Sequence, residues 1–304
     1  MLHIIVATVY ISLCLLFTPC YVKLIHVFIT SKTYRSRKAY KLMTQIGIAQ
    51  CATSPGLIAL GYSIATCNDP HGIASMLMKV MNSCRRVDAI LSVALALERL
   101  QTIYIWRRLT FLVDGLTALA WLYGAANFGI FISPLAEFVV VPETFGPVYN
   151  SSYPATHTIK KVNFFSSVGA SVATFILYLL IIARLIRQKL AVKTFNIDVN
   201  EKAIFIQAFV RFFCDTLMLI FYHIVPLILP RSVVLEITTT LGYIVNNLVL
   251  PPVLSIMKST KGRPCVCSKG VNSAAILTHR YIKCSDCEAL MSYSIFRPSS
   301  IYPK

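Results

Sequence analysis

Seven apolar stretches restrict what this chain can fold into. Each is long enough for a helix to cross the hydrocarbon core of a bilayer, which needs about 20 residues. The stretches are continuous rather than alternating, so a transmembrane β-barrel is excluded, and each must be helical because lipid cannot hydrogen-bond free backbone groups. The sequence therefore predicts an all-α membrane protein, a bundle of seven transmembrane helices at residues 2–26, 42–65, 73–97, 109–133, 164–186, 203–229 and 233–257.

The composition is typical of a membrane-spanning chain. Of the 304 residues, 56% are hydrophobic and 13% are charged, against roughly 25% charged residues in soluble domains. The first stretch lacks a basic n-region and is too long for the apolar core of a signal peptide, so we expect a span that also acts as the targeting signal. Residues 1–257 form the predicted seven-helix domain, and residues 258–304 a basic, cysteine-containing cytoplasmic tail that we expect to be disordered.

The basic residues predict which side of the membrane each loop faces, because Lys and Arg are retained on the cytoplasmic side. They gather in residues 32–41, 99–108, 184–202 and 258–304, whereas the opposite loops hold only Lys160, Lys161 and Arg231. This asymmetry predicts an N-terminus outside and a C-terminus in the cytoplasm. It also accounts for the net charge of +17 through contact with anionic lipid, without nucleic acid as a partner.

A glycosylation sequon provides an independent indication of the same topology. Asn150-Ser151-Ser152 fits the pattern for N-glycosylation. It lies in residues 134–163, the loop that the basic residues place outside. Asn150 is therefore the candidate glycosylation site.

Polar and charged residues interrupt the third stretch with the spacing of a helix. Asn82, Arg85, Asp88, Ser92 and Arg99 follow one another in steps of three, four or seven residues, which keeps them on one helix face. With a rise of 1.5 Å per residue, Asp88 is expected ~16 Å from Arg99, near the middle of the membrane. We interpret this stripe either as a ligand pocket or activation switch, or as a structural network that fixes helix packing.

Further ionisable residues lie within the predicted spans. Spacing predicts two pairs on single helix faces, Arg85 with Asp88 and Arg211 with Asp215. Unpaired charges in this setting cost several kcal/mol, so the remaining ones need partners from other helices. The candidate polar network or pocket consists of the stripe residues Asn82, Arg85, Asp88 and Ser92 together with Asp114, Arg211, Asp215 and Glu236.

Three charges do not fit this scheme. Lys79 is expected to reach the outer interface with its long side chain, and Glu236 to reach water at the outer end of the last span. Arg86 falls off the stripe, and spacing assigns it no partner.

Glu98-Arg99-Leu100 ends the third stretch at its predicted cytoplasmic end. In a chain with seven predicted spans and an outside N-terminus, it resembles the Asp/Glu-Arg-Tyr motif of rhodopsin-like receptors. The chain is also similar to nematode serpentine chemoreceptors, with class T and class xa the nearest groups. This similarity rests on Tyr40-Lys41-Leu42-Met43, Gly47-Ile48-Ala49-Gln50, Ser54-Pro55-Gly56, Arg86-Val87-Asp88-Ala89-Ile90-Leu91-Ser92 and Leu95-Ala96-Leu97-Glu98-Arg99-Leu100.

The resemblance covers residues 1–257 and implies a G-protein-coupled chemoreceptor. Such a receptor binds an external small molecule and signals to a heterotrimeric G protein, as a multi-pass protein of the plasma membrane, with the sensory cilium as one location. In these receptors the arginine of the motif engages the G protein when active and is held by its neighbours when silent. Glu98, Arg99 and Leu100 are therefore the expected coupling residues.

The sequence also departs from the rhodopsin-like pattern. Residues 101–200 contain no cysteine, so the usual disulfide between the third span and the following outer loop cannot form, and Cys67 is left alone. The last span has Asn246-Asn247 and Pro251-Pro252 in place of Asn-Pro-x-x-Tyr. These differences weaken the transfer of the activation mechanism but leave the topology unchanged.

Two other classes of function remain as alternatives. Intramembrane charges are also typical of a transporter or ligand-gated channel, although no internal repeat supports that interpretation. An enzyme is not expected, because the spans show no His-rich cluster, Ser-His-Asp set or Gly-rich phosphate loop. We predict no cofactor.

Cysteines of the tail allow three interpretations. Cys265 and Cys267 adjoin basic residues and are candidates for palmitoylation. The same pair, with Cys284 and Cys287, is one residue short of a paired CxxC zinc site. Free thiols are the third possibility.

Overall fold

The computed structural model describes residues 1–104, 110–141, 144–191, 209–210, 212–218, 220–221, 225 and 232–251. The predicted tail and Arg211, Cys265 and Cys267 lie outside these residues, as does most of the sixth stretch. The elements are α1 (Leu2–Thr30), α2 (Lys32–Arg35), α3 (Lys38–Cys51), α4 (Ser54–Thr66), a 3-10 turn (Pro70–Gly72), α5 (Ile73–Tyr104), α6 (Thr110–Ile132), β1 (Glu137–Val140), β2 (Pro147–Asn150), α7 (Thr156–Ala191), α10 (Val233–Ile244) and a π-helical turn (Val245–Val249).

Three helices, α1, α6 and α7, are long and apolar enough to cross a membrane. They contain the first, fourth and fifth predicted stretches. Large apolar side chains on these helices are exposed; Leu122 is 68% exposed and Phe165 is 67% exposed. Soluble monomers rarely expose contiguous apolar surface of this kind, so these helices are suited to a lipid environment.

The second predicted stretch forms two helices, α3 and α4, instead of one. Pro55 lies in the first turn of α4 and has no backbone N–H, so it cannot donate to the carbonyl of Cys51 one turn earlier. The two linking residues, Ala52 and Thr53, nevertheless keep helical backbone angles. The chain therefore continues in the same helical sense through a break caused by proline.

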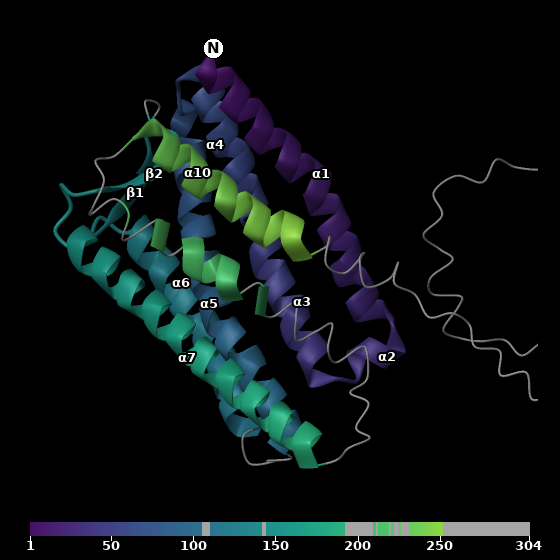
Figure 1. Ribbon diagram of the computed structural model, residues 1–304. Coiled ribbons are helices and arrows are strands. Elements are labelled where there is room, and N and C mark those ends of the chain that lie inside the picture. Colours follow the sequence, from purple (N-terminus) through teal and green to yellow (C-terminus); the bar gives the residue numbers. More distant parts are fainter. Residues whose placement is uncertain are drawn as a thin grey trace, which may run out of the picture. The chain divides into compact units, whose positions relative to one another are not determined.

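α3 and α4 run in the same direction, and α1, this pair, α5, α6 and α7 alternate in direction between two ends of the bundle (Figure 1). At one end, which we call the hairpin end, His3 stacks on Phe145 at 4.8 Å, and the carboxylate of Glu236 accepts from the Phe145 N–H at 3.2 Å. At the other, the Lys38 end, Lys38 meets the start of α6, and Arg184 of α7 lies over the ring of Tyr104. Tyrosines and amides described below link the helices between these ends.

The third predicted stretch forms α5, which packs against α3, α4, α6, α7 and β1. Its apolar side chains enter three separate clusters along its length. Met78 packs with α1 and α4, Leu91 with α3 and α6, and Leu100 with α7. α5 is therefore the helix around which its neighbours are arranged, and its middle turns carry the charged residues Arg85, Arg86 and Asp88.

The segment predicted as the outer loop before α7 contains structure that the sequence did not predict. β1 and β2 form an antiparallel pair in which Phe138 lies opposite Tyr149. These two rings and Phe131 of α6 form an aromatic group, with centroids 4.8–6.1 Å apart. α7 also begins at Thr156, within the segment predicted as loop. The bundle thus carries a small two-stranded sheet at its hairpin end.

The start of the last predicted stretch forms α10 and the π-helical turn. Ser232 caps α10 by accepting from the N–H of Leu235 at 3.3 Å. The π-helical turn holds Asn246 and Asn247, both buried, shortly before Pro251. A π-turn widens the helix locally and occurs often at functional positions.

Close helix packing at Gly56 provides a test of this arrangement. A Cβ atom at Gly56 would lie 2.9 Å from the backbone carbonyl oxygen of Leu77, which cannot move without shifting α5. We expect Gly56→Ala to lower the free energy of unfolding by about 1–3 kcal/mol, measured by thermal unfolding in detergent micelles. The control is Gly129→Ala on α6, where a Cβ would meet nothing within 4 Å. If the two variants unfold at the same temperature, the packing of α4 on α5 is not as described.

Candidate functional site

The polar residues of α5 lie on two sides of the helix and belong to two separate groups. The first group faces α1 and α3. The hydroxyl of Tyr21 donates to Gln50 Oε1 at 2.5 Å, and Gln50 Nε2 donates to Asp88 Oδ2 at 3.1 Å. Gln50 is 1% exposed, so this chain of hydrogen bonds crosses the apolar interior from α1 through α3 to α5.

On the same side, α10 contacts the stripe predicted from the sequence. The guanidinium of Arg85 lies over the ring of Tyr243, 3.5 Å from its centroid, a favourable arrangement of a cation on an aromatic face. Ser92 donates to the backbone carbonyl of Asp88 at 2.9 Å. The predicted pairing of Arg85 with Asp88 stays a prediction. Both residues lie on the side of α5 that faces α3 and α10.

Asp215 belongs to the described part of the sixth stretch and meets the π-helical turn. Asn246 Nδ2 donates to Asp215 Oδ1 at 2.5 Å. A π-turn changes the directions of the side chains in Val245–Val249, and the Asn246 amide points here toward the segment that contains Asp215. The predicted partner of Asp215, Arg211, lies outside the described residues.

The second group surrounds Arg86, to which helical spacing assigned no partner, and we call it the Arg86 cluster. It consists of Asn82, Tyr123, Asn127, Tyr149, Asn163 and Ser167 around Arg86, from α5, α6, β2 and α7. Arg86 is 4% exposed and donates from Nη1 to the backbone carbonyl of Asn163 at 2.8 Å and to Ser167 Oγ. Asn82, predicted with the Arg85 stripe, instead accepts from Arg86 Nη2 at 3.3 Å.

Amide side chains extend the Arg86 cluster to α6 and the hairpin. Tyr123 and Asn127 donate to Asn163 Oδ1 at 3.0 and 2.7 Å, and Asn82 donates to the hydroxyl of Tyr149 at 3.1 Å. Asn127 and Asn163 are 4% and 1% exposed. The cluster therefore holds three helices and the hairpin together by polar contacts in a dry environment, where such contacts are costly to leave unpaired.

Glu98, Arg99 and Leu100 lie at the Lys38 end of α5. Arg99 Nε is 3.9 Å from Glu98 Oε2, and the two side chains are 25% and 12% exposed. Arg99 Nε and Nη2 are buried and have no hydrogen-bond partner. Leu100 packs against Tyr178 of α7. Within the described part of the chain, Arg99 thus makes a long contact with its neighbour Glu98, and two of its donor nitrogens have no hydrogen-bond partner.

Aromatic rings gather at the same end of the bundle, and one of them, Tyr40, interacts with Arg99. Tyr40 lies at the start of α3, with its ring centroid 4.7 Å from that of Tyr34 and 5.5 Å from that of Phe28. Burial raises the pKa of Tyr40 and Tyr34 raises it further, while the positive charges of Arg99 and Arg37 lower it. The end of α1, α2 and the start of α3 therefore close around the Glu98–Arg99 region.

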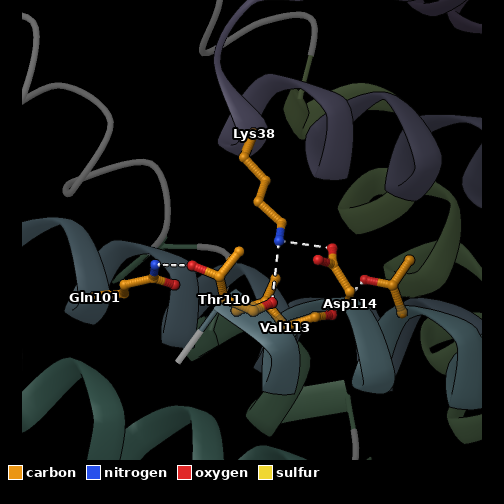
Figure 2. A network of polar contacts seen from close by, with 6 residues as sticks. Lys38, Gln101, Thr110, Val113 and Asp114 are labelled. Atoms are coloured by element: carbon orange, nitrogen blue, oxygen red, sulfur yellow. Dashed lines mark hydrogen bonds and ion pairs between the residues drawn. The ribbon is translucent and has the colours of Figure 1, made fainter. Parts of the chain in front are cut away.

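Asp114 does not join the polar residues in the middle of α5. It lies in the second turn of α6, where its carboxylate is 2.6 Å from Lys38 Nζ, and its side chain is 65% exposed. Figure 2 shows Lys38 reaching down to this carboxylate and to the backbone carbonyl of Thr110, while Gln101 of α5 contacts the Thr110 hydroxyl. The group ties three helix ends together at the Lys38 end.

Glu236 and Asn150 both belong to the hairpin end. Glu236 binds a backbone N–H of the hairpin turn, as described above, rather than facing water alone. Asn150 ends β2; its Nδ2 donates to Glu137 Oε2 at 2.6 Å, and its Oδ1 accepts from the N–H of Ser152 at 3.1 Å. The sequon is thus at the edge of the sheet, with Ser151 and Ser152 exposed.

Sequence reasoning found the charged members of the site and missed most of the neutral ones. Gln50, Asn127, Asn163 and Ser167 received no role, although polar side chains inside apolar stretches often hydrogen-bond across helices. That signal was present in the sequence. In the described part of the chain, no group of three or more His, Cys, Asp or Glu side chains is arranged to hold a metal ion.

Comparison with known proteins adds no relative. No protein-family model matches the chain, and no curated protein matches it.

The role of Gln50 can be tested by removing its amide. Gln50→Leu leaves the Tyr21 hydroxyl and the Asp88 carboxylate without this bridge, so we expect the free energy of unfolding to fall by about 1–3 kcal/mol. Thermal unfolding in micelles measures it. Gln45→Leu on the same helix is the control, because Gln45 accepts one exposed hydrogen bond, from Trp121 Nε1, and should change stability by less than about 0.5 kcal/mol.

A double-mutant cycle separates the bridge from a loss of packing. Tyr21→Phe removes only the hydroxyl, so its effect should be much smaller in the Gln50→Leu background than in the native chain. Additive effects would contradict the proposed bridge.

Proposed function

We propose that this chain is a G-protein-coupled chemoreceptor with seven membrane spans, an outside N-terminus and a cytoplasmic C-terminus. It binds an external small molecule and signals to a heterotrimeric G protein, in contact with anionic lipid and without nucleic acid. Three apolar helices, alternating helix directions and a central polar helix support this proposal. The plasma membrane is its proposed location, and no catalytic step is part of the proposal.

The observation that carries the proposal is the state of Arg99. Its guanidinium lies at the end of the central helix, 3.9 Å from Glu98, and Nε and Nη2 have no hydrogen-bond partner among the residues that the structure describes. A guanidinium in this condition is ready to accept new partners such as backbone carbonyls of a docking helix. In the proposed topology this end faces the cytoplasm, where the G protein is found.

The polar groups along α5 provide a route from ligand to Arg99. Ligand contacts near the hairpin end would change the packing of α10 on Arg85 and of α3 on Asp88, which lie on the same helix as Arg99. Because a ligand shifts an equilibrium only by its differential affinity for two states, these contacts have to differ between the silent and active forms.

A transporter or channel remains the alternative function. The interior charges of α5 also suit an ion or substrate pathway. Substrate uptake or ligand-evoked current in cells that lack G protein would favour this alternative over the receptor.

Glycosylation tests the proposed topology. The sequon needs Ser152 but tolerates change at Ser151. We expect the chain expressed in animal cells to lose mass on treatment with an endoglycosidase that removes N-glycans, and Ser152→Ala to abolish this shift while Ser151→Ala retains it. An unglycosylated native chain with the hairpin accessible to a membrane-impermeant label only after permeabilisation would reverse the orientation.

Substitution of Arg99 tests the coupling role. Cells that express the chain with a G-protein biosensor are screened with small volatile and water-soluble compounds, and active compounds are retested on Arg99→Ala. Two charge-assisted hydrogen bonds are each worth about 1.5–3 kcal/mol, so we expect the response to fall at least about tenfold at equal surface abundance.

The matched control is Arg35→Ala, an exposed arginine of α2 at the same end. We expect it to keep its response within about twofold, because an exposed side chain contributes little. An undiminished response in Arg99→Ala would remove Arg99 from the mechanism, and no response to any compound in any G-protein background would count against the receptor.

A further inference from the structure

Arg86 is a buried cation without a buried anion in the described part of the chain. Its guanidinium remains protonated in proteins, so it cannot escape the cost of burial by losing a proton. Its partners are all neutral: the backbone carbonyl of Asn163, the hydroxyl of Ser167 and the amide oxygen of Asn82. Leaving a buried charge uncompensated costs several kcal/mol, which indicates that a counter-charge belongs here.

The described carboxylates do not supply this counter-charge, because each is engaged elsewhere. Asp114 pairs with Lys38, and Glu98 lies beside Arg99. The others accept hydrogen bonds from groups outside the Arg86 cluster: Asp69 from Ala74 and Ser75, Asp88 from Gln50, Glu137 from Asn150, Asp215 from Asn246, and Glu236 from Phe145.

Three polar atoms of the Arg86 cluster have no hydrogen-bond partner among the described residues. Arg86 Nε and Asn163 Nδ2 are buried donors without partners, and Asn127 Oδ1 is a buried acceptor without one. Buried polar atoms without partners are rare in folded proteins and often mark a bound ion or water. Two donors, one of them on a cation, favour an anion, and a water molecule that accompanies the anion can donate to Asn127.

We propose that the Arg86 cluster binds a small carboxylate anion. Nη1 of Arg86 donates to Asn163 and Ser167, and Nη2 donates one of its two hydrogens to Asn82, so the edge formed by Nε and Nη2 keeps the Nε–H and one Nη2 hydrogen as donors. Parallel N–H groups on such an edge match the two oxygens of a carboxylate. Asn163 Nδ2 adds a neutral donor, and because the cluster is buried we propose small carboxylates, formate or acetate, as the anion.

This site is distinct from the residues predicted for ligand binding. Arg85 and Asp88 face α3 and α10, whereas Arg86 faces α6, α7 and the hairpin. The proposal stands whether or not the chain couples to a G protein, because it rests only on the charge and the unfilled atoms of the cluster.

The test measures thermal unfolding of the purified full chain in detergent micelles. Sodium formate and sodium acetate are titrated against a background of a bulky sulfonate at constant ionic strength. A ligand that binds only the folded state stabilises it in proportion to the logarithm of its concentration above the dissociation constant. We expect the midpoint to rise by about 3 °C or more for each tenfold increase in formate.

The deciding variant is Asn163→Asp, which places a carboxylate beside Arg86 with almost no change in shape. We expect it to unfold at a higher temperature than the native chain in the sulfonate background and to lose the response to formate. Asn68→Asp makes the same change of charge at an exposed position of the hairpin end and should keep the response. Arg86→Gln should lose the response, and if it does not fold, Asn163→Asp still decides.

Three outcomes would overturn the proposal. An equal midpoint shift with chloride in place of formate would identify a halide site instead of a carboxylate site. If none of these anions shifts the unfolding midpoint, the Arg86 cluster would hold water instead of an anion. A formate response that persists in Asn163→Asp would place the bound anion away from Arg86.

Discussion

Polar groups inside an apolar bundle have to find their partners within the protein, since neither lipid tails nor apolar side chains replace the hydrogen bonds of water. α5 carries two guanidinium groups, a carboxylate and an amide in its middle turns, and neighbouring elements contact each of them. Gln50 comes from α3, Tyr243 from α10, Asn163 from α7 and Tyr149 from the hairpin. Moving any of these elements away from α5 would leave a charge or an amide unpaired, so these contacts select one arrangement of the bundle and penalise others. Apolar packing alone would allow the helices to rotate or slide at lower cost.

The sequence predicted which segments form helices more reliably than it predicted which elements contact one another. Hydropathy located α1, α6 and α7, because a continuous apolar run of this length is a strong signal. It treated residues 42–65 as one helix, although Pro55 signals a break in backbone hydrogen bonding. The hairpin was missed because four-residue strands, such as Glu137–Val140, are too short for a clear alternating pattern. Periodicity correctly placed Arg85 and Asp88 in the interior, but it describes one helix at a time.

Which helix faces a given residue could not be read from spacing. Arg86 was left without a partner because its acceptors, in α7, are about 80 residues later in the chain. Asn82 lies on the predicted stripe yet bonds to Arg86, since a side chain one turn away can lean toward either side of a helix. Asp114 was counted among interior charges, but α6 begins only one turn before it, and the long side chain of Lys38 extends across to it. These outcomes depend on tertiary packing, which local sequence does not encode.

The break at Pro55 has a consequence for motion. The carbonyl oxygen of Cys51 cannot accept a backbone hydrogen bond from residue 55, because Pro55 has no N–H. The helical path formed by α3 and α4 therefore bends most easily at Ala52 and Thr53. Gln50 lies immediately before this joint, and Gly56, where α4 touches the backbone of α5, lies immediately after it. A tilt of α4 at Ala52 and Thr53 would therefore change the hydrogen bond between Gln50 and Asp88, because Gln50 lies only a few residues from this break. Movement at the hairpin end, where α4 finishes, would be transmitted to the middle of α5 as a change in a single amide–carboxylate distance.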